Sequence, residues 1–335
     1  MMDIQPFSLP LSSPLSTADG TIESRRGFLV RTEIDGVAGV GEAAPLPGWT
    51  ESYDACQAAL CGVEKPKQAL EDNVFDDTPA ARHAVSLAVA DAAARRAGVP
   101  LYRRLGAGER VESVPVNATV GDGSPSATAE AVADAAAAGF PAAKVKVGNR
   151  SLDADIERIE AVRQRYPDIE LRVDANGAWE FETAREAVES LSALGVAVLE
   201  QPLPAEALDN HRRLRGHGID IALDEGLLRH GVDAAIAAEA ADCLVCKPMA
   251  LGGVDIARSA AERARADGWD VIVTTTIDGV VARAAAVHLA ASVPDVRPCG
   301  LATGGRLASD VGPDAAPVSD GTAAVPQGKG NIPPL

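Results

Sequence analysis

The chain has 335 residues, a formal net charge of −17 and 47% hydrophobic residues, enough for one large domain and a smaller one. The negative charge argues against nucleic acid and anionic membranes as partners, because no basic stripe is available to contact phosphates. Neither a signal peptide nor a transmembrane helix is predicted, so we expect a cytoplasmic protein that binds a small molecule.

Two residue types are unevenly used. Only six lysines occur, and Lys144, Lys146 and Lys247 lie in one periodic stretch. We interpret the acidic, lysine-poor composition as salt adaptation, so the lysines retained in that stretch are expected to have functions. The five cysteines predict no disulfide framework in a chain of this length. Cys243 and Cys246 are interpreted as core residues, because a zinc site would need further ligands.

Residues 1–108 predict an α+β unit with a hairpin, since two alternating runs flank a turn at Asp35-Gly36. A segment rich in Pro and Gly follows, and then two helical patterns. The hairpin, the irregular segment and the two helices are expected at 27–45, 45–52, 53–65 and 78–98.

Residues 109–308 predict a TIM-like barrel, because short apolar runs alternate with helical patterns about every 25 residues. Residues 309–335, rich in Pro, Gly and Asp, are expected to pack back on the first unit. The barrel strands are expected at 113–120, 142–148, 169–176, 196–202, 219–226, 242–248, 269–276 and 295–305.

Three acids end consecutive predicted strands, namely Asp174, Glu200 and Asp224. Active sites of such barrels lie at the carboxyl ends of the strands, so these side chains are expected to converge. Three buried carboxylates need a cation, and all-oxygen ligands indicate Mg²⁺ or Mn²⁺. The alternative is that each acid caps a helix or pairs with an arginine.

The lysines predict acid–base chemistry. Lys144 and Lys146 are two residues apart on one strand, so both point into the barrel, and neighbouring ammonium groups lower each other's pKa. A lysine with a lowered pKa can act as a general base. With Lys247 arriving from the opposite wall, the set predicts proton abstraction next to a carboxylate. The alternative is that the lysines only neutralise the acids. Asn176 and Glu225 are expected to support the metal ligands or lysines.

The motifs K-x-K, D-A-N, E-Q-P, D-E-G and K-P at these spacings resemble the enolase superfamily, in its muconate-lactonizing-enzyme-like branch. The resemblance extends over nearly the whole chain and implies a capping domain followed by a (β/α)₇β barrel. It implies that Asp174, Glu200 and Asp224 bind Mg²⁺, and that Lys146 and Lys247 are the acid–base pair.

Three stretches, 41–52, 171–179 and 274–304, resemble the o-succinylbenzoate synthase family of that branch. This implies syn dehydration of 2-succinyl-6-hydroxy-2,4-cyclohexadiene-1-carboxylate, a step in menaquinone synthesis. Lys146 would remove the proton and return it to the leaving hydroxide, while Mg²⁺ and Lys247 stabilise the enediolate. Lys144 would tune Lys146, and Arg172 would help to orient it.

The resemblance also implies a mobile loop at 45–50 that covers the substrate. The expected substrate contacts are Pro47, Gly48, Trp49, Thr274, Thr275, Thr276, Gly300 and Leu301. Ile277-Asp278 departs from the family pattern. The last strand lacks an Asp-x-Asp motif, which disfavours a dipeptide epimerase, and the threonines replace the histidine of mandelate-racemase-like members. The alternatives that stay open are an N-succinylamino acid racemase, a dipeptide epimerase despite that missing motif, another two-lysine cycloisomerase, a Schiff-base aldolase using Lys247 and a binding scaffold. A homo-oligomer is also considered.

Overall fold

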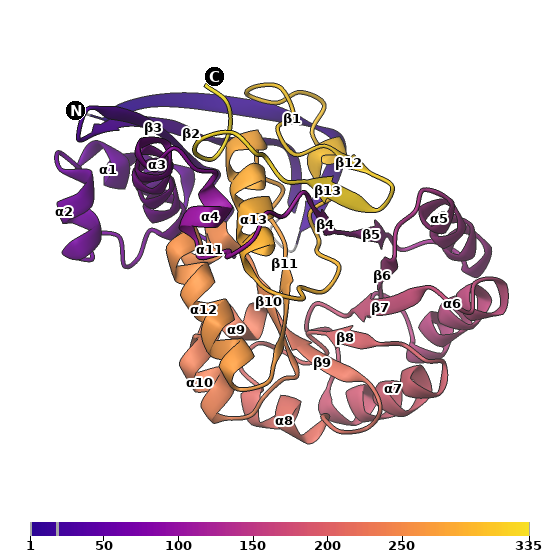
Figure 1. Cartoon of the computed structure of the whole chain (residues 1–335). Helices are drawn as coiled ribbons and strands as arrows, with labels where there is room; N and C mark the ends of the chain where they lie inside the picture. Colours follow the sequence, from indigo (N-terminus) through magenta and orange to yellow (C-terminus); the bar gives the residue numbers. More distant parts are fainter. Residues whose placement is uncertain (1, 18–19, 335) are drawn as a thin grey trace.

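The computed structural model describes residues 2–17 and 20–334, and it contains three sheets (Figure 1). The N-terminal sheet has the order β1-β2-β3, and its strands are β1 (Asp3–Thr17), β2 (Gly20–Ile34) and β3 (Val37–Ala43). Asp35 and Gly36 both have positive φ, at 52° and 79°, which suits a tight hairpin turn and confirms the predicted hairpin. Strand β1 was not predicted. Its prolines are tolerated because it lies at the edge of the sheet.

Helices follow this sheet in the chain. They are α1 (Tyr53–Cys61), α2 (Pro66–Glu71), α3 (Pro79–Ala97) and α4 (Leu101–Arg104). Helix α3 packs directly on β2 and β3. The predicted helix at 78–98 is confirmed, whereas the one at 53–65 ends earlier, at Cys61. Strand β3 approaches α3 so closely that a Cβ on Gly41 would lie 1.9 Å from Ala84 O. Only glycine fits there, and the capping sheet is thereby seated directly on α3.

The seven-stranded parallel sheet follows the chain in order from β5 to β11 and curls into a barrel. Its strands are β5 (Asn117–Val120), β6 (Ala142–Lys146), β7 (Glu170–Asp174), β8 (Val198–Glu200), β9 (Asp220–Leu223), β10 (Cys243–Cys246) and β11 (Asp270–Val273). Cys243 and Cys246 are fully buried and unbridged, so their interpretation as core residues is confirmed.

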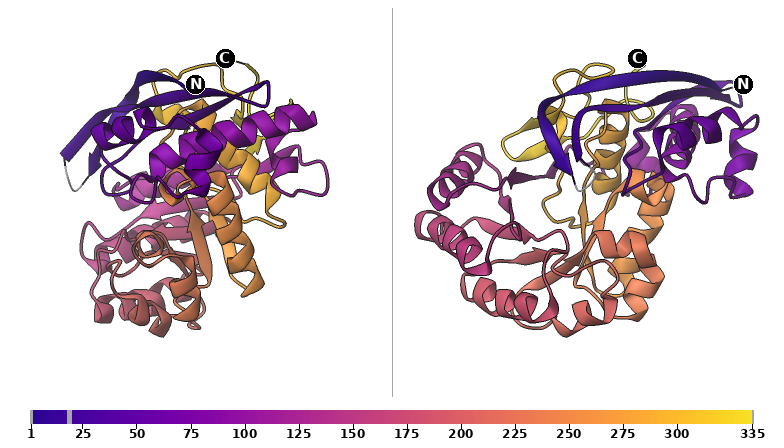
Figure 2. Two further views of the ribbon diagram at one scale, coloured as in Figure 1. Left: turned by 90° about the vertical axis from the view of Figure 1, so that its left-hand side faces the viewer. Right: turned by 180° about the vertical axis from the view of Figure 1, so that it is seen from behind.

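The helices that follow these strands, with one exception, lie on the outside of the curled sheet (Figure 2). They are α5 (Pro125–Ala137), α6 (Leu152–Arg165), α7 (Phe181–Ala193), α8 (Leu208–Arg213), α9 (Glu225–His230), α10 (Val232–Ala237), α11 (Pro248–Leu251), α12 (Val254–Ala266) and α13 (Val280–Ser292). The exception is α11, which packs against α3. Among the helices of the described chain, none is both long and apolar enough to cross a membrane.

The barrel closes without a full eighth strand. Cys299 bridges Val116 and Gly300 bridges Thr274, as isolated parallel pairs. The predicted strand at 295–305 is therefore wrong in extent, because Pro298 lacks an N–H and the pairing stops at Gly300. The predicted first strand is also split. Its beginning, β4 (Ser113–Pro115), pairs with the tail strand β13 (Thr322–Ala324), which in turn pairs with β12 (Val318–Ser319).

The C-terminal segment runs back over α3 and α13 (Figure 1). Asn331 N donates to Asp91 Oδ1 at 2.7 Å, and Arg95 Nη2 donates to Ile332 O at 2.6 Å. His288 Nε2 lies 2.7 Å from Asn331 O. The tail thus connects α3 of the N-terminal unit to α13 of the barrel. The exact domain limits at 108 and 308 stay a prediction.

Candidate active site

Sheet register brings the predicted charges to one end of the barrel. Lys146 is the Cα partner of Asp174, and Asp174 is the Cα partner of Glu200. Asp224 and Lys247 come directly after strands β9 and β10. Five of the predicted residues therefore end neighbouring strands at one barrel mouth, as expected for a parallel barrel.

Hydrogen bonds join the lysines to the acids. Lys144 Nζ donates to Asp174 Oδ2 at 2.9 Å and to Glu200 Oε1 at 2.6 Å, and Lys146 Nζ donates to Asp174 Oδ2 at 2.6 Å. Lys247 Nζ donates to Asp224 Oδ2 at 2.5 Å. The three carboxylates are buried, so each ammonium compensates a charge that water does not reach.

Burial and neighbouring charges together shift the pKa values of these acids in different directions. It raises the pKa of Glu200, and the negative charge of Asp174 raises it further. Burial also raises the pKa of Asp224, against the opposing charge of Lys247. For Asp174 burial is outweighed by Lys144 and Lys146, which lower its pKa. The charge of one acid thus changes the pKa of its neighbour, as expected for buried carboxylates that lie close together.

The prediction that Lys144 has a lowered pKa is wrong. Burial alone would lower it, but Asp174 and Glu200 outweigh burial and raise the pKa of Lys144. The sequence argument considered the neighbouring ammonium group and not the two carboxylates that hold Lys144. This lysine is therefore a fixed positive charge between two acids.

The donor atoms suit Mg²⁺, although lysines now hold them. The three converging side chains offer carboxylate oxygens, and Glu225 Oε2 is buried with no hydrogen-bond partner. In the described part of the chain, no three His, Cys, Asp or Glu side chains are grouped tightly enough to hold a metal ion. A cation would therefore have to displace ammonium contacts, so the assignment of Asp174, Glu200 and Asp224 as its ligands stays a prediction.

Asn176 connects two of the predicted residues. It accepts from Lys146 Nζ at 2.7 Å and donates to Glu225 Oε1 at 3.1 Å. Sequence reasoning missed Gln201, whose Oε1 accepts from the backbone N–H groups of Asp224 and Gly226, both at 3.0 Å. Gln201 thereby fixes the turn that presents Asp224. Its place beside Glu200 was the available signal.

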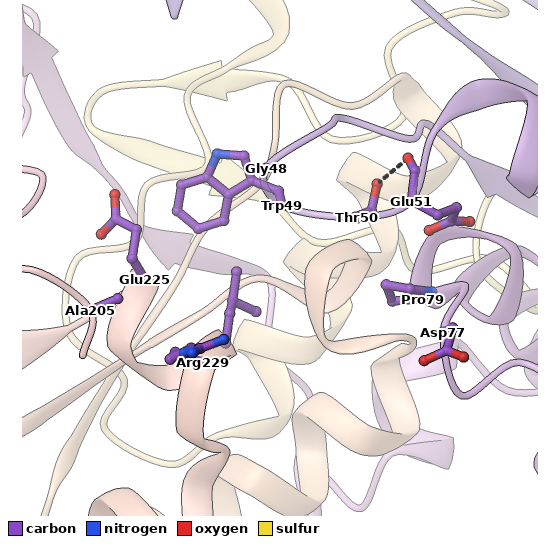
Figure 3. Close-up of a pocket in the computed structure, with 10 residues that line it drawn as sticks. Gly48, Trp49, Thr50, Glu51, Asp77, Pro79, Ala205, Glu225 and Arg229 are labelled. Carbon is purple, nitrogen blue, oxygen red and sulfur yellow. Dashed lines mark hydrogen bonds between the residues drawn. The ribbon is translucent and has the colours of Figure 1, made fainter. Parts of the chain in front are cut away.

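Trp49 reaches from the capping unit to the barrel. Lys247 Nζ lies 3.3 Å from the centre of the Trp49 ring, a cation–π contact. The ring borders an open cavity of about 620 Å³ that is also lined by Gly48, Glu225 and Arg229 (Figure 3). Glu225 and Arg229 form one side of it, and Glu51 and Asp77 the other. The predicted loop at 45–50 therefore does face the site.

The other predicted substrate contacts have protein partners. Thr274 Oγ1 donates to Gly300 O at 2.9 Å, Thr275 pairs with Thr303, and Thr276 donates to Asp278 at 2.5 Å. Leu301 is 1% exposed and packs in the core, which does not support a substrate contact there. Pro47 is exposed and is not among the residues that line the cavity.

Arg172 does not orient Lys146. Its Nε donates to Glu170 at 2.6 Å and its Nη1 donates to Pro298 O at 2.7 Å. In the register of β6 and β7, Arg172 lies beside Lys144 and Glu170 lies beside Ala142, so these contacts are nearer the start of the strands than Lys146 is. Arg172 is therefore part of the barrel interior, and the expectation of a contact with Lys146 is corrected.

Comparison with known proteins agrees with this geometry. A family model described as enolase C-terminal domain-like matches residues 127–331, and one described as MenC, N-terminal domain, matches residues 1–92. The chain belongs to the enolase superfamily. Its relatives place it in the muconate-lactonizing-enzyme-like branch, as the motifs indicated.

Relatives of this enolase-superfamily chain catalyse different reactions. L-Ala-D/L-Glu epimerase from Bacillus subtilis is 30% identical over 306 residues, covering 85% of this chain and 83% of the epimerase. o-Succinylbenzoate synthase from Mycobacterium tuberculosis is 40% identical over 226 residues, covering 64% of this chain and 65% of the synthase. A solved dipeptide epimerase from Methylococcus capsulatus, complexed with Mg and a dipeptide, is 27% identical with a TM-score of 0.87, covering 99% of this chain and 98% of that one. The predicted capped barrel is confirmed.

Proposed function

We propose that the chain is an o-succinylbenzoate synthase that dehydrates 2-succinyl-6-hydroxy-2,4-cyclohexadiene-1-carboxylate in menaquinone synthesis. The observation that carries the chemistry is the pair of ammonium groups at the barrel mouth, Lys146 on Asp174 and Lys247 on Asp224. The synthase assignment is supported by the 40% identity to the mycobacterial synthase and by the N-terminal family match.

In this proposal Lys146 is the base and then the acid. Its neutral amine takes the proton next to the ring carboxylate, and the resulting ammonium gives that proton to the departing hydroxide, which leaves as water. Both transfers use one atom, Lys146 Nζ, so the proton and the hydroxide leave from one face. Asn176, which accepts from this Nζ, holds it in place.

Lys247 supplies a second positive charge from the far wall. Trp49 covers its ammonium, which keeps water away and strengthens its interaction with a developing negative charge. Mg²⁺, when bound by Asp174, Glu200 and Asp224, would supply further positive charge beside the substrate carboxylate and acidify the proton next to it. Support for this ion comes from the carboxylate donors here and from the Mg complex of the related epimerase.

An N-succinylamino acid racemase is the second candidate. Two lysines on opposite walls could remove a proton from one face and return one to the other, so the same cluster suits isomerization. The epimerase relative, which aligns with more of the chain than the synthase does, favours this class.

One assay separates these reactions. The purified protein is given the ring substrate and, separately, N-succinyl amino acids, each with Mg²⁺ and with EDTA. We expect Mg²⁺-dependent formation of o-succinylbenzoate with a higher kcat/KM than any racemization. Racemization without dehydration of the ring substrate would transfer the assignment to the racemase.

A further inference from the structure

A buried arginine of the capping unit joins two segments that face the site. Arg25, on β2, is 2% exposed. Its Nη2 donates to Ala44 O at 2.6 Å, its Nη1 donates to Pro45 O at 3.1 Å, and its Nε donates to Ile277 O at 3.1 Å. One guanidinium therefore holds carbonyl groups from the capping unit and from the barrel.

Both segments lead to the active site. Ala44 and Pro45 begin the turn that presents Trp49, in which Trp49 N donates to Leu46 O at 2.9 Å. Ile277 lies in the connection from β11 to α13, directly after the predicted contacts at 274–276. Arg25 is thus bonded at the base of the loop that covers the Lys247 ammonium and at the barrel rim after β11, the strand next to the one that Lys247 follows.

The connection at Ile277 needs such a restraint. Ile277 has φ of 62°, a left-handed conformation that is costly for a β-branched residue and persists only where the surroundings impose it. Thr275 Oγ1 accepts from Ile277 N at 3.3 Å, and Arg25 holds its carbonyl. The strained conformation therefore depends in part on a residue of the capping unit.

A second contact of the same kind lies beside it. Glu42 accepts from the N–H groups of Gly279, Val281 and Ala282 at the start of α13, at 2.6, 3.1 and 3.0 Å. A Cβ at Gly279 would lie 2.9 Å from the Glu42 carboxylate, so only glycine allows this approach. Glu42 fixes the helix, whereas Arg25 bonds to both site-facing segments.

We propose that Arg25 is a positioning residue that makes the Trp49 loop and the β11–α13 connection move as one unit. An opening of either segment breaks a hydrogen bond to the same buried guanidinium and releases the other. The effect on turnover rests on the proposed function, but the mechanical coupling does not. Lysine cannot replace arginine here, because a single ammonium cannot reach three carbonyls that a planar fork spans.

The coupling is tested by backbone hydrogen exchange without substrate. Arg25→Lys is compared with Arg26→Lys as a control. The side chain of Arg26 is exposed and its guanidinium lies over the Tyr53 ring. We expect exchange to accelerate roughly tenfold or more at residues 45–50 and at 275–279 together in Arg25→Lys. Arg26→Lys should leave both segments unchanged. Faster exchange in one segment alone, or in neither, would overturn the proposal.

A second variant approaches the coupling from the barrel side. Gly279→Ala pushes on the Glu42 contact and leaves Arg25 unaltered, so it serves even where Arg25→Lys does not fold. Coupling is reciprocal, so exchange at 45–50 should rise with that at 275–279. An effect limited to 275–282 would contradict the proposal.

Turnover gives an independent reading. If the active-site role is correct, Arg25→Lys lowers kcat on the order of 100-fold with a smaller change in KM, because the groups are misplaced and not lost. Coupled exchange with unchanged turnover would retain the mechanical link and reject its catalytic use. If the wild-type protein does not convert the ring substrate, the proposed function is rejected, but the hydrogen-exchange result still stands.

Discussion

At the scale of single residues, the site is a set of compensated charges. Lys144 is the clearest example of a compensating charge, because its ammonium contacts two buried carboxylates and its side chain is 16% exposed. Sequence spacing predicted that the lysines and acids meet, since strand ends of a parallel barrel converge. It did not predict which cation pairs with which acid, because that depends on side-chain conformation.

Lys144→Met should destabilise the protein by about 3 kcal/mol, because Asp174 and Glu200 lose a buried counter-charge. Added Mg²⁺ should raise the melting temperature of this variant more than that of the wild type, since a divalent ion can take over the compensation. Thermal melts with and without Mg²⁺ check both. Lys67→Met, at an exposed ion pair, is the control. A Mg²⁺ response that is absent from Lys144→Met would contradict the metal assignment.

At the scale of elements, helix α13 of the barrel contacts both the capping unit and the C-terminal tail. Glu42 contacts its beginning, and His288 lies between Tyr102 N, at 3.2 Å, and Asn331 O, at 2.7 Å. Because Nδ1 accepts from a backbone N–H, the imidazole is neutral. Burial lowers the pKa of His288 from 6.5 to about 4. A protonated ring would place an N–H against the Tyr102 N–H.

His288 should therefore make stability depend on pH. Between pH 6.5 and 4 the unfolded chain binds a proton that the folded chain does not, so stability falls as the pH is lowered through this window. The slope from this residue reaches at most about 1.4 kcal/mol per pH unit. Urea unfolding of the wild type and His288→Gln between about pH 5 and 6.5 isolates it. Equal slopes for both proteins would refute the assignment.

The elements also show where sequence prediction succeeds. The parallel strands β6 to β11 were predicted because each is a short apolar run ending in a charge or a turn. Strand β1 was missed because Pro6, Pro10 and Pro14 hide its alternation, although it pairs with β2, the next strand in the chain. Closure at Cys299 and Gly300 was predicted as a longer strand, since two isolated bridges leave no pattern. Arg25 and Glu42 gave no local signal for their contacts with the barrel, because Ile277 and Gly279 are over 200 residues away from them.

At the scale of the whole molecule, the charge of −17 works against compactness. Added salt screens repulsion between surface carboxylates, so the melting temperature should rise between roughly 0.1 and 1 M KCl, over which the Debye length falls from about 10 to 3 Å. Melts in KCl, with sucrose as an uncharged comparison, check this. A melting temperature that does not rise with KCl would contradict the interpretation as salt adaptation.

The central claim is that Lys146 moves the proton. Its most direct test is the rate of conversion of the ring substrate by Lys146→Arg, with Lys67→Arg as the control for the same exchange at the surface. Arginine keeps the charge but cannot release a proton near neutral pH. The account predicts a fall in kcat of about 10²- to 10⁴-fold in Lys146→Arg and none in the control. A wild-type rate in Lys146→Arg would contradict it.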